Sequence, residues 1–183
     1  DIQIQVMDPD IDPPAEPPEI VCAAAGPDAA ELAARIADSL WVTSPDPETI
    51  TAYRDAGGTG TVYAQLNLCY APERDEAIAT AHRIWPNTAI PGQLSQDLPT
   101  WTHFEQAAEL VTPEMVAEQM PCGADVAAVR AGVQEYLDAG ATALHLHQIG
   151  PDQEGFLRWW RTDLADELAG LDTRLDTRVG APG

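Results

Sequence analysis

Short apolar runs alternate with amphipathic stretches along this chain. The apolar runs predict strands at residues 20–25, 40–42, 61–70 and 143–148. Apolar residues at helical spacing predict a helix after each strand, at residues 28–38, 47–56, 73–84 and 153–168, and one more at 125–139. Strands that each lead into a helix are typical of a parallel α/β fold.

The first predicted helix, residues 28–38, is rich in alanine. Gly26 and Pro27 come directly before it, and proline suits the first position of a helix. Leu32 and Ile36 lie four residues apart, which gives the helix one apolar stripe.

The third predicted strand, residues 61–70, has two different faces. Alternate residues of a strand point to opposite sides. Gln65, Asn67 and Cys69 therefore share one face, while the other is apolar and carries Ala64, Leu66, Leu68 and Tyr70. One face should meet helices and the other something polar.

A long excursion, residues 85–120, separates the third helix from the helix at 125–139. Four prolines divide it into short helical pieces. Excursions of this kind between regular elements often carry function. The four βα units together make half of a (β/α)₈ barrel, a fold of about 250 residues.

The charge pattern is strongly acidic. The 183 residues include 30 Asp and Glu against 9 Arg and no Lys, for a net charge of −21. Such a surface repels nucleic-acid phosphates and anionic lipid, so neither partner is expected. It is typical of proteins that stay hydrated at high salt, where charges are screened within about 3 Å at 1 M. The alternative is an ordinary acidic cytosolic protein.

Three cysteines, Cys22, Cys69 and Cys122, are widely spaced and form no CxxC pair. They are expected to be small buried residues in a reducing compartment, not parts of a disulfide framework or a zinc site. No apolar run reaches the roughly 18 residues of a membrane span, and the amino terminus has no signal-peptide pattern. A cytoplasmic location follows as the expectation.

The ends of the chain differ from its middle. Residues 1–18 form an acidic, proline-rich leading segment, and residues 170–183 contain a near-repeat of Leu-Asp-Thr-Arg that suggests a flexible tail. Residues 19–169 hold the predicted folded unit. The chain begins with Asp1, and we expect it to be a piece of a longer protein.

Three segments carry a family resemblance. They are IVCAAAGPDAAELAARIADSLWVTSPDP at 20–47, SQDLPTWTHFEQAAELVT at 95–112 and HLHQIGPDQEGFL at 145–157. In order and spacing they resemble the luciferase-like oxidoreductases, above all the F420-dependent glucose-6-phosphate dehydrogenase-like branch. The resemblance implies a (β/α)₈ barrel of the TIM type, of which this chain holds about the last four βα units.

What the resemblance implies about function is hydride transfer between a small substrate and coenzyme F420, with FMN as the alternative cofactor. The N-terminal half of the barrel is then missing, and with it the acid and base residues of the family, so that no catalytic residue is assigned. The isolated chain should be inactive, and a homodimer is conceivable. The alternative is a non-catalytic truncated paralogue or interaction module that needs a partner chain.

The family places its cofactor at the end of the strand that corresponds to residues 20–25. Ala23, Ala24, Ala25 and Gly26 are therefore the expected cofactor contacts, since small residues let a flat ring or a phosphate approach the backbone. The alternative is that these small residues only allow a helix and a strand to pack closely.

The substrate positions depart from the family pattern. Thr43 matches a threonine that contacts the substrate, but Asp46, Glu118 and the pair Glu154-Gly155 stand where the glucose-6-phosphate enzymes have cations. Acidic side chains repel a phosphate. The departure argues for a non-phosphorylated substrate in place of glucose 6-phosphate.

Two histidines, His145 and His147, lie two residues apart in the last strand and so share a face. His147 is closer to the carboxyl end and is expected to contact the substrate. His145 is expected to be a hydrogen-bonded filler of the barrel interior. Zinc-type ligand spacing is missing, and no metal is predicted.

Overall fold

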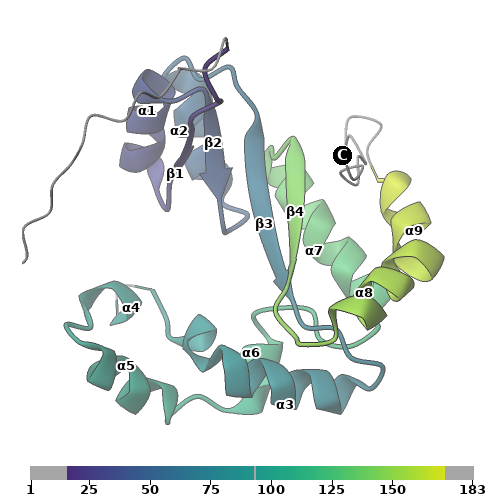
Figure 1. Cartoon of the computed structure of the whole chain (residues 1–183). Helices are drawn as coiled ribbons and strands as arrows, with labels where there is room; N and C mark the ends of the chain where they lie inside the picture. Colours follow the sequence, from purple (N-terminus) through teal and green to yellow (C-terminus); the bar gives the residue numbers. More distant parts are fainter. Residues whose placement is uncertain (1–15, 93, 172–183) are drawn as a thin grey trace, which may run out of the picture.

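A computed structural model describes residues 16–92 and 94–171 of the chain. Four parallel strands form one sheet in the order β1-β2-β3-β4, which is also their order in the sequence. The strands are β1 (Val21–Ala23), β2 (Ser39–Val42), β3 (Val62–Leu68) and β4 (Ala143–Gln148). Figure 1 shows them side by side, and the predicted parallel α/β class is confirmed.

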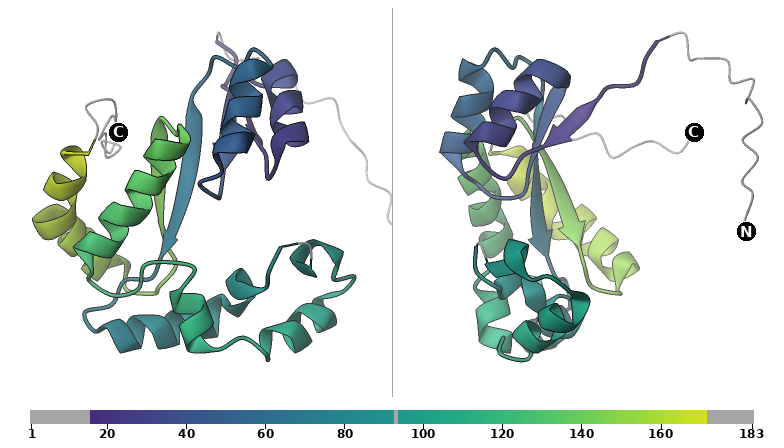
Figure 2. Two further views of the ribbon diagram at one scale, coloured as in Figure 1. Left: turned by 180° about the vertical axis from the view of Figure 1, so that it is seen from behind. Right: turned by 90° about the vertical axis from the view of Figure 1, so that its left-hand side faces the viewer.

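Every predicted helix is present with bounds close to those expected. The helices are α1 (Pro27–Ile36), α2 (Pro47–Asp55), α3 (Arg74–Ile84), α7 (Val126–Ala139) and α8 (Gln153–Trp159), which continues through a π-helical turn (Trp160–Leu164) into α9 (Ala165–Ala169). Together, α8, the π-helical turn and α9 replace the single closing helix expected at 153–168. In the right-hand view of Figure 2, α1, α2 and α7 lie on one side of the strands.

Local sequence signals set the helix ends. Pro47 occupies the first turn of α2, and the carboxylate of Asp46 accepts hydrogen bonds from the amides of Glu48 and Thr49. Asp125 caps α7 in the same way through the amide of Ala128. Gly140 ends α7 at φ +107°, a left-handed conformation that favours glycine.

The main core lies between the sheet and the helices. Alternate residues of β3 enter it, so that Ala64, Leu66 and Leu68 are buried while Gln65 and Asn67 remain half-exposed on the other face. The helices contribute most of the other buried residues of this core: Ala30, Ala33, Ile50, Tyr53, Val129, Val133, Tyr136, Phe156, Trp159, Leu164 and Leu168. The expected two-faced character of this strand is therefore confirmed for residues 62–68.

The apolar stripe of α1 does not form its packing face. Leu32 and Ile36 are 48% and 59% exposed, whereas Ala30 and Ala33 are fully buried. The helix packs through its alanines, and a methyl group lets a helix approach its neighbours more closely than a leucine does. The four-residue spacing of Leu32 and Ile36 therefore marks an apolar stripe on the outside of the described fold.

The excursion folds into short helices with a core of its own. It comprises a 3₁₀ turn (Pro86–Ala89), α4 (Leu94–Asp97), α5 (Trp101–Ala108) and α6 (Pro113–Ala117). Its apolar cluster is built from α3, from these pieces and from the end of β3: Cys69, Ala71, Ala77, Ala81, Ile90, Val111, Val116, Met120 and Cys122. The prediction of short helical pieces between 85 and 120 is confirmed.

The cysteines only partly follow expectation. Cys69 and Cys122 are buried and bridge the end of β3 to the end of the excursion through their backbones, so Cys69 belongs to the second core instead of the polar face. Burial, followed by the nearby Cys122, raises the pKa of Cys69 to about 11, which keeps it an unreactive thiol. Cys22 is only half-buried, because its strand β1 lies at the edge of the sheet.

Across residues 16–92 and 94–171, no helix has the length and apolar character that crossing a membrane requires.

Candidate active site

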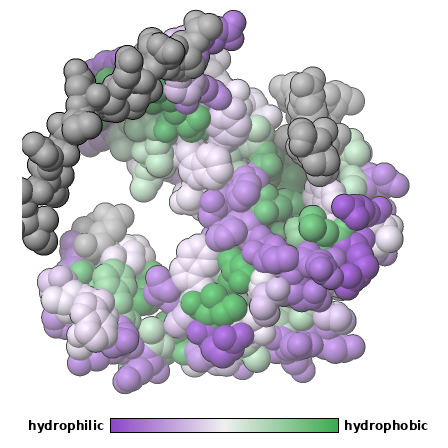
Figure 3. Space-filling model, in the orientation of Figure 1, coloured by the Kyte–Doolittle hydropathy of each residue, from purple (hydrophilic) through white to green (hydrophobic). Residues whose placement is uncertain are grey.

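The carboxyl ends of the strands converge on one side of the molecule. In Figure 1 the strand arrows point toward α3 and the excursion, and helices α3 to α6 lie beyond the ends of the strands. The space-filling view in Figure 3 shows a wide hollow on this side, between the β1 and β2 end of the sheet and the arm formed by α4 and α5. In parallel α/β folds, ligands bind at this end of the sheet.

The four small residues at the end of β1 and directly after it, Ala23 to Gly26, do not share one environment. Ala24 is buried in the main core, and its amide donates to the carbonyl of Trp41. Ala23 and Ala25 are exposed, because alternate residues of an extended chain face opposite ways. Ala23 is the register partner of Trp41, which places it on the face of the sheet away from the helices.

Gly26 forms the cap position of α1 in an extended conformation that any residue adopts, with φ −172°. A Cβ added there would meet no heavy atom within 4 Å. Close packing within the described chain therefore does not require glycine at this position. No side chain caps this helix either, which leaves the amides of its first turn available to an anion.

The uncovered face of the sheet is lined by aromatic and polar side chains. Trp41 stacks on Tyr63 and lies beside His145, with ring centroids 6.0 Å and 5.8 Å away. The His145 ring in turn stacks on His147 at 6.1 Å. His145 is exposed and makes no hydrogen bond within the described chain, so its expected role as a hydrogen-bonded filler of the complete barrel interior stays a prediction. Ring contacts hold it instead.

His147 lies near the carboxyl end of β4 and opposite Asn67 in register. Its Nδ1 is 2.9 Å from the Asn67 Oδ1, and the same oxygen accepts a hydrogen bond of 2.9 Å from the Gln65 Nε2. The ring of Trp85, which follows α3, meets the His147 ring edge-on at 5.6 Å. Residues from β3, β4 and the excursion thus come together at this point.

Thr43 lies directly after β2, with its side chain exposed. Its carbonyl oxygen is 2.9 Å from the hydroxyl of Tyr136, a buried residue of α7. The backbone at Thr43 is therefore fixed by a hydrogen bond from α7, and this bond does not involve the Thr43 side chain.

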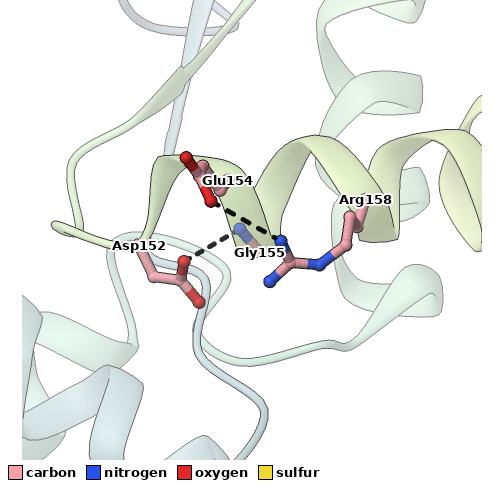
Figure 4. A network of polar contacts seen from close by, with 4 residues as sticks. All are labelled: Asp152, Glu154, Gly155 and Arg158. Atoms are coloured by element: carbon pink, nitrogen blue, oxygen red, sulfur yellow. Dashed lines mark hydrogen bonds and ion pairs between the residues drawn. The ribbon is translucent and has the colours of Figure 1, made fainter.

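The three acidic residues that depart from the family pattern, Asp46, Glu118 and Glu154, all lie at or near helix ends. The hydrogen bond from the Thr49 hydroxyl, followed by that from the Glu48 amide, holds the pKa of Asp46 below its ordinary value. Glu118 is exposed at the end of α6. Glu154 lies 3.9 Å from Arg158, one turn along α8, as Figure 4 shows. Because this ion pair is exposed to solvent, Arg158 neutralises the charge of Glu154 only partly.

Sequence reasoning missed three residues of this site. Trp41 and Tyr63 alternate in step with the polar residues of their strands, so the alternation of strand residues could have placed both on the polar face. No sequence pattern predicts the contact between Trp85 and His147, because the two residues are far apart in the sequence and only the tertiary fold brings them together. Within residues 16–92 and 94–171, no group of three or more His, Cys, Asp or Glu side chains is arranged to hold a metal ion.

Comparison with known proteins identifies relatives over most of the chain, although no family model matches it. An F420-dependent glucose-6-phosphate dehydrogenase from Tsukamurella paurometabola is 25% identical in a match 173 residues long that covers 87% of this chain and 51% of the relative. An F420-dependent hydroxymycolic acid dehydrogenase from Mycobacterium tuberculosis is 32% identical in a match 166 residues long that covers 86% of this chain and 44% of the relative.

Solved structures share the fold. An F420-dependent secondary alcohol dehydrogenase in complex with an F420-acetone adduct superposes with a TM-score of 0.68 at 18% identity, over 85% of this chain and 50% of that one. The F420-dependent tetrahydromethanopterin reductase from Methanopyrus kandleri gives a TM-score of 0.56 at 19% identity, over 82% and 51%. The four-stranded parallel sheet is a partial TIM barrel. The chain belongs to the luciferase-like family of F420-dependent oxidoreductases and spans about half the length of the curated relatives it matches.

Proposed function

We propose that this chain supplies half of a barrel that binds coenzyme F420 and transfers hydride between it and a small, non-phosphorylated organic substrate. The observation that carries the proposal is the bare exit of β1: small, exposed residues and an uncapped helix start lie beside the hollow at the strand ends. The relatives named above are F420-dependent enzymes, which favours F420 over FMN. The cofactor supplies the ring carbon that accepts or donates the hydride.

The cofactor contacts follow from the backbone at the carboxyl end of β1. Ala23 and Ala25 present only methyl groups, and Gly26 presents no side chain at all. A flat ring can therefore approach the main chain there, and the first-turn amides of α1 can bind an anionic group of the cofactor. Ala24 supports this surface from the core.

The substrate is proposed to lack a phosphate. Asp46, Glu118 and Glu154 are carboxylates at the positions where the resemblance places cations, and a phosphate would be repelled by them. Thr43 and His147 remain as the substrate contacts of this half, since both lie at carboxyl ends of strands. This combination suits a neutral or cationic alcohol, carbonyl or enone.

The barrel needs a second half. In the described chain β1 pairs only with β2 and β4 only with β3, so each leaves one edge unpaired. Four further βα units would pair with both edges and enclose the aromatic and polar face of the sheet. The proposed complement is the N-terminal half of the same family of barrels, which would also carry the acid and base residues.

The test compares the chain alone with the chain joined to a complementary N-terminal half. F420 binding is followed by fluorescence titration and turnover by F420 absorbance, with FMN as the control ligand. We expect turnover only in the joined form and tighter binding of F420 than of FMN. Turnover by the chain alone would refute the need for a second half, and failure of every form to bind F420 would refute the proposed function.

A further inference from the structure

Three side chains on the uncovered face form a polar network that the proposed cofactor contacts do not use. Asn67 Oδ1 accepts a hydrogen bond from Gln65 Nε2 and lies 2.9 Å from His147 Nδ1. The distance from Gln65 Nε2 to His147 Nδ1 is longer, at 3.4 Å. Asn67 is therefore the centre of the network.

This arrangement determines which nitrogen of His147 carries the proton. An amide oxygen only accepts hydrogen bonds, so the Nδ1 facing Asn67 must be the donor. In the neutral ring the other nitrogen, Nε2, then has a free lone pair. No residue of the described chain hydrogen-bonds to that Nε2.

The surroundings of His147 fix the direction of its ring. Trp85 contacts it edge-on at a centroid distance of 5.6 Å, and His145 stacks on it at 6.1 Å. The ring is half-buried and lies one residue before the end of β4, on the face that no helix covers. A group held in this way presents its free nitrogen to whatever occupies the site.

We propose that His147 Nε2 accepts a hydrogen bond from a hydroxyl group of the substrate, and that Asn67 and Gln65 are positioning residues for it. The proposal rests on the proposed function and narrows its substrate class to alcohols. An unprotonated nitrogen favours a ligand that carries a donor. It repels the lone pairs of a carboxylate or phosphate, as do the carboxylates of Asp46 and Glu118.

The tautomer can be measured in the chain itself, without cofactor. Long-range ¹H–¹⁵N spectra of histidine-labelled protein at about pH 9, above the range in which histidines titrate, should show His147 protonated at Nδ1. Asn67→Leu removes the acceptor and should move the proton to Nε2, the position preferred by free histidine. Gln65→Leu is the matched control, because it keeps Asn67 and should keep the Nδ1–H form.

The substrate contact is tested in the joined barrel with F420 and 2-propanol as the probe alcohol. His147→Leu and Asn67→Leu should raise the KM for 2-propanol about tenfold, the effect of one lost hydrogen bond. The kcat and the affinity for F420 should change less than the KM. Gln65→Leu should have a smaller effect.

Each failure has a different meaning. An Nε2–H tautomer in the unmodified chain would mean that both amides are turned the other way, and it would overturn the proposal. An unchanged KM in His147→Leu would overturn the substrate contact and leave the F420 proposal intact. If even the unmodified joined barrel fails to bind F420, the proposed function falls and the substrate contact falls with it.

Discussion

The hydroxyl of Tyr136 lies 2.9 Å from the carbonyl oxygen of Thr43, and 2.9 Å from that of Gln65. One buried residue of α7 thus contacts the backbone at the exit of β2 and in the middle of β3. A phenol has one proton, so it donates to one carbonyl at a time.

Removal of this hydroxyl should destabilise the fold. Tyr136→Phe leaves two carbonyls without their shared donor, and the free energy of unfolding should fall by about 1–3 kcal/mol. Denaturant titration measures the effect. Tyr70→Phe is the matched control, because the described chain gives the Tyr70 hydroxyl no hydrogen bond. An equal loss in both variants would contradict the importance of the two carbonyl contacts.

Tyr136 also predicts a pH dependence at the alkaline end. Burial, followed by the nearby Glu135, raises the pKa of Tyr136 from 10.0 to about 12. A group whose pKa is raised on folding stabilises the fold below its unfolded pKa, and this contribution is lost as the pH rises through its folded pKa. Stability should therefore decline between about pH 10 and 12. Burial also raises the pKa of Cys69, so this thiol adds to the decline. The contribution of Tyr136 is therefore measured by comparison with Tyr136→Phe, in which the loss of stability over this pH range should be smaller.

Gly26→Val tests the cofactor contact. Because a Cβ at Gly26 meets no described atom within 4 Å, far-ultraviolet dichroism should change little. The branched side chain should block the approach of F420 to the backbone and weaken binding by the joined barrel about tenfold, equivalent to about 1.4 kcal/mol. Gly26→Ala should have a smaller effect. Unchanged F420 affinity in a folded Gly26→Val variant would remove this position from the proposed cofactor contacts.

Gly60→Ala should behave in the opposite way. A Cβ at Gly60 would collide with the backbone carbonyl of Asp38, which cannot move aside as a flexible side chain can. We expect a loss of about 3 kcal/mol in the free energy of unfolding. Thermal or denaturant unfolding checks it, with Gly26→Ala as the tolerated counterpart. A stability equal to that of the unmodified chain would show that the turn between α2 and β3 opens readily.

The charge balance predicts a requirement for salt. With a net charge of −21, the folded chain repels itself in dilute buffer, and salt screens that repulsion. The midpoint of thermal unfolding should rise as KCl increases from low to multimolar concentration. NaCl should act similarly if screening is the cause. A flat or falling midpoint would contradict the salt-adapted interpretation.

Much of the fold could be predicted from local pattern. Apolar runs and helical spacing act over a few residues, so the strands and the helices that follow them were visible along the chain. The parity of strand residues likewise predicted that His145 and His147 would share a face. The proposed cofactor role of the small residues at 23–26 came from the family resemblance, because small residues by themselves also suit close packing of a helix against a strand.

The sequence by itself thus determined the order and type of the elements, because these depend on neighbours in the chain. Only the tertiary structure decided which side of α1 packs, because Ala30 and Ala33 allow a closer approach than Leu32 and Ile36. It also decided the partners of His147. Asn67 and Trp85 are 80 and 62 residues away along the chain, and only the packing of β3, β4 and the excursion brings their side chains to the same imidazole.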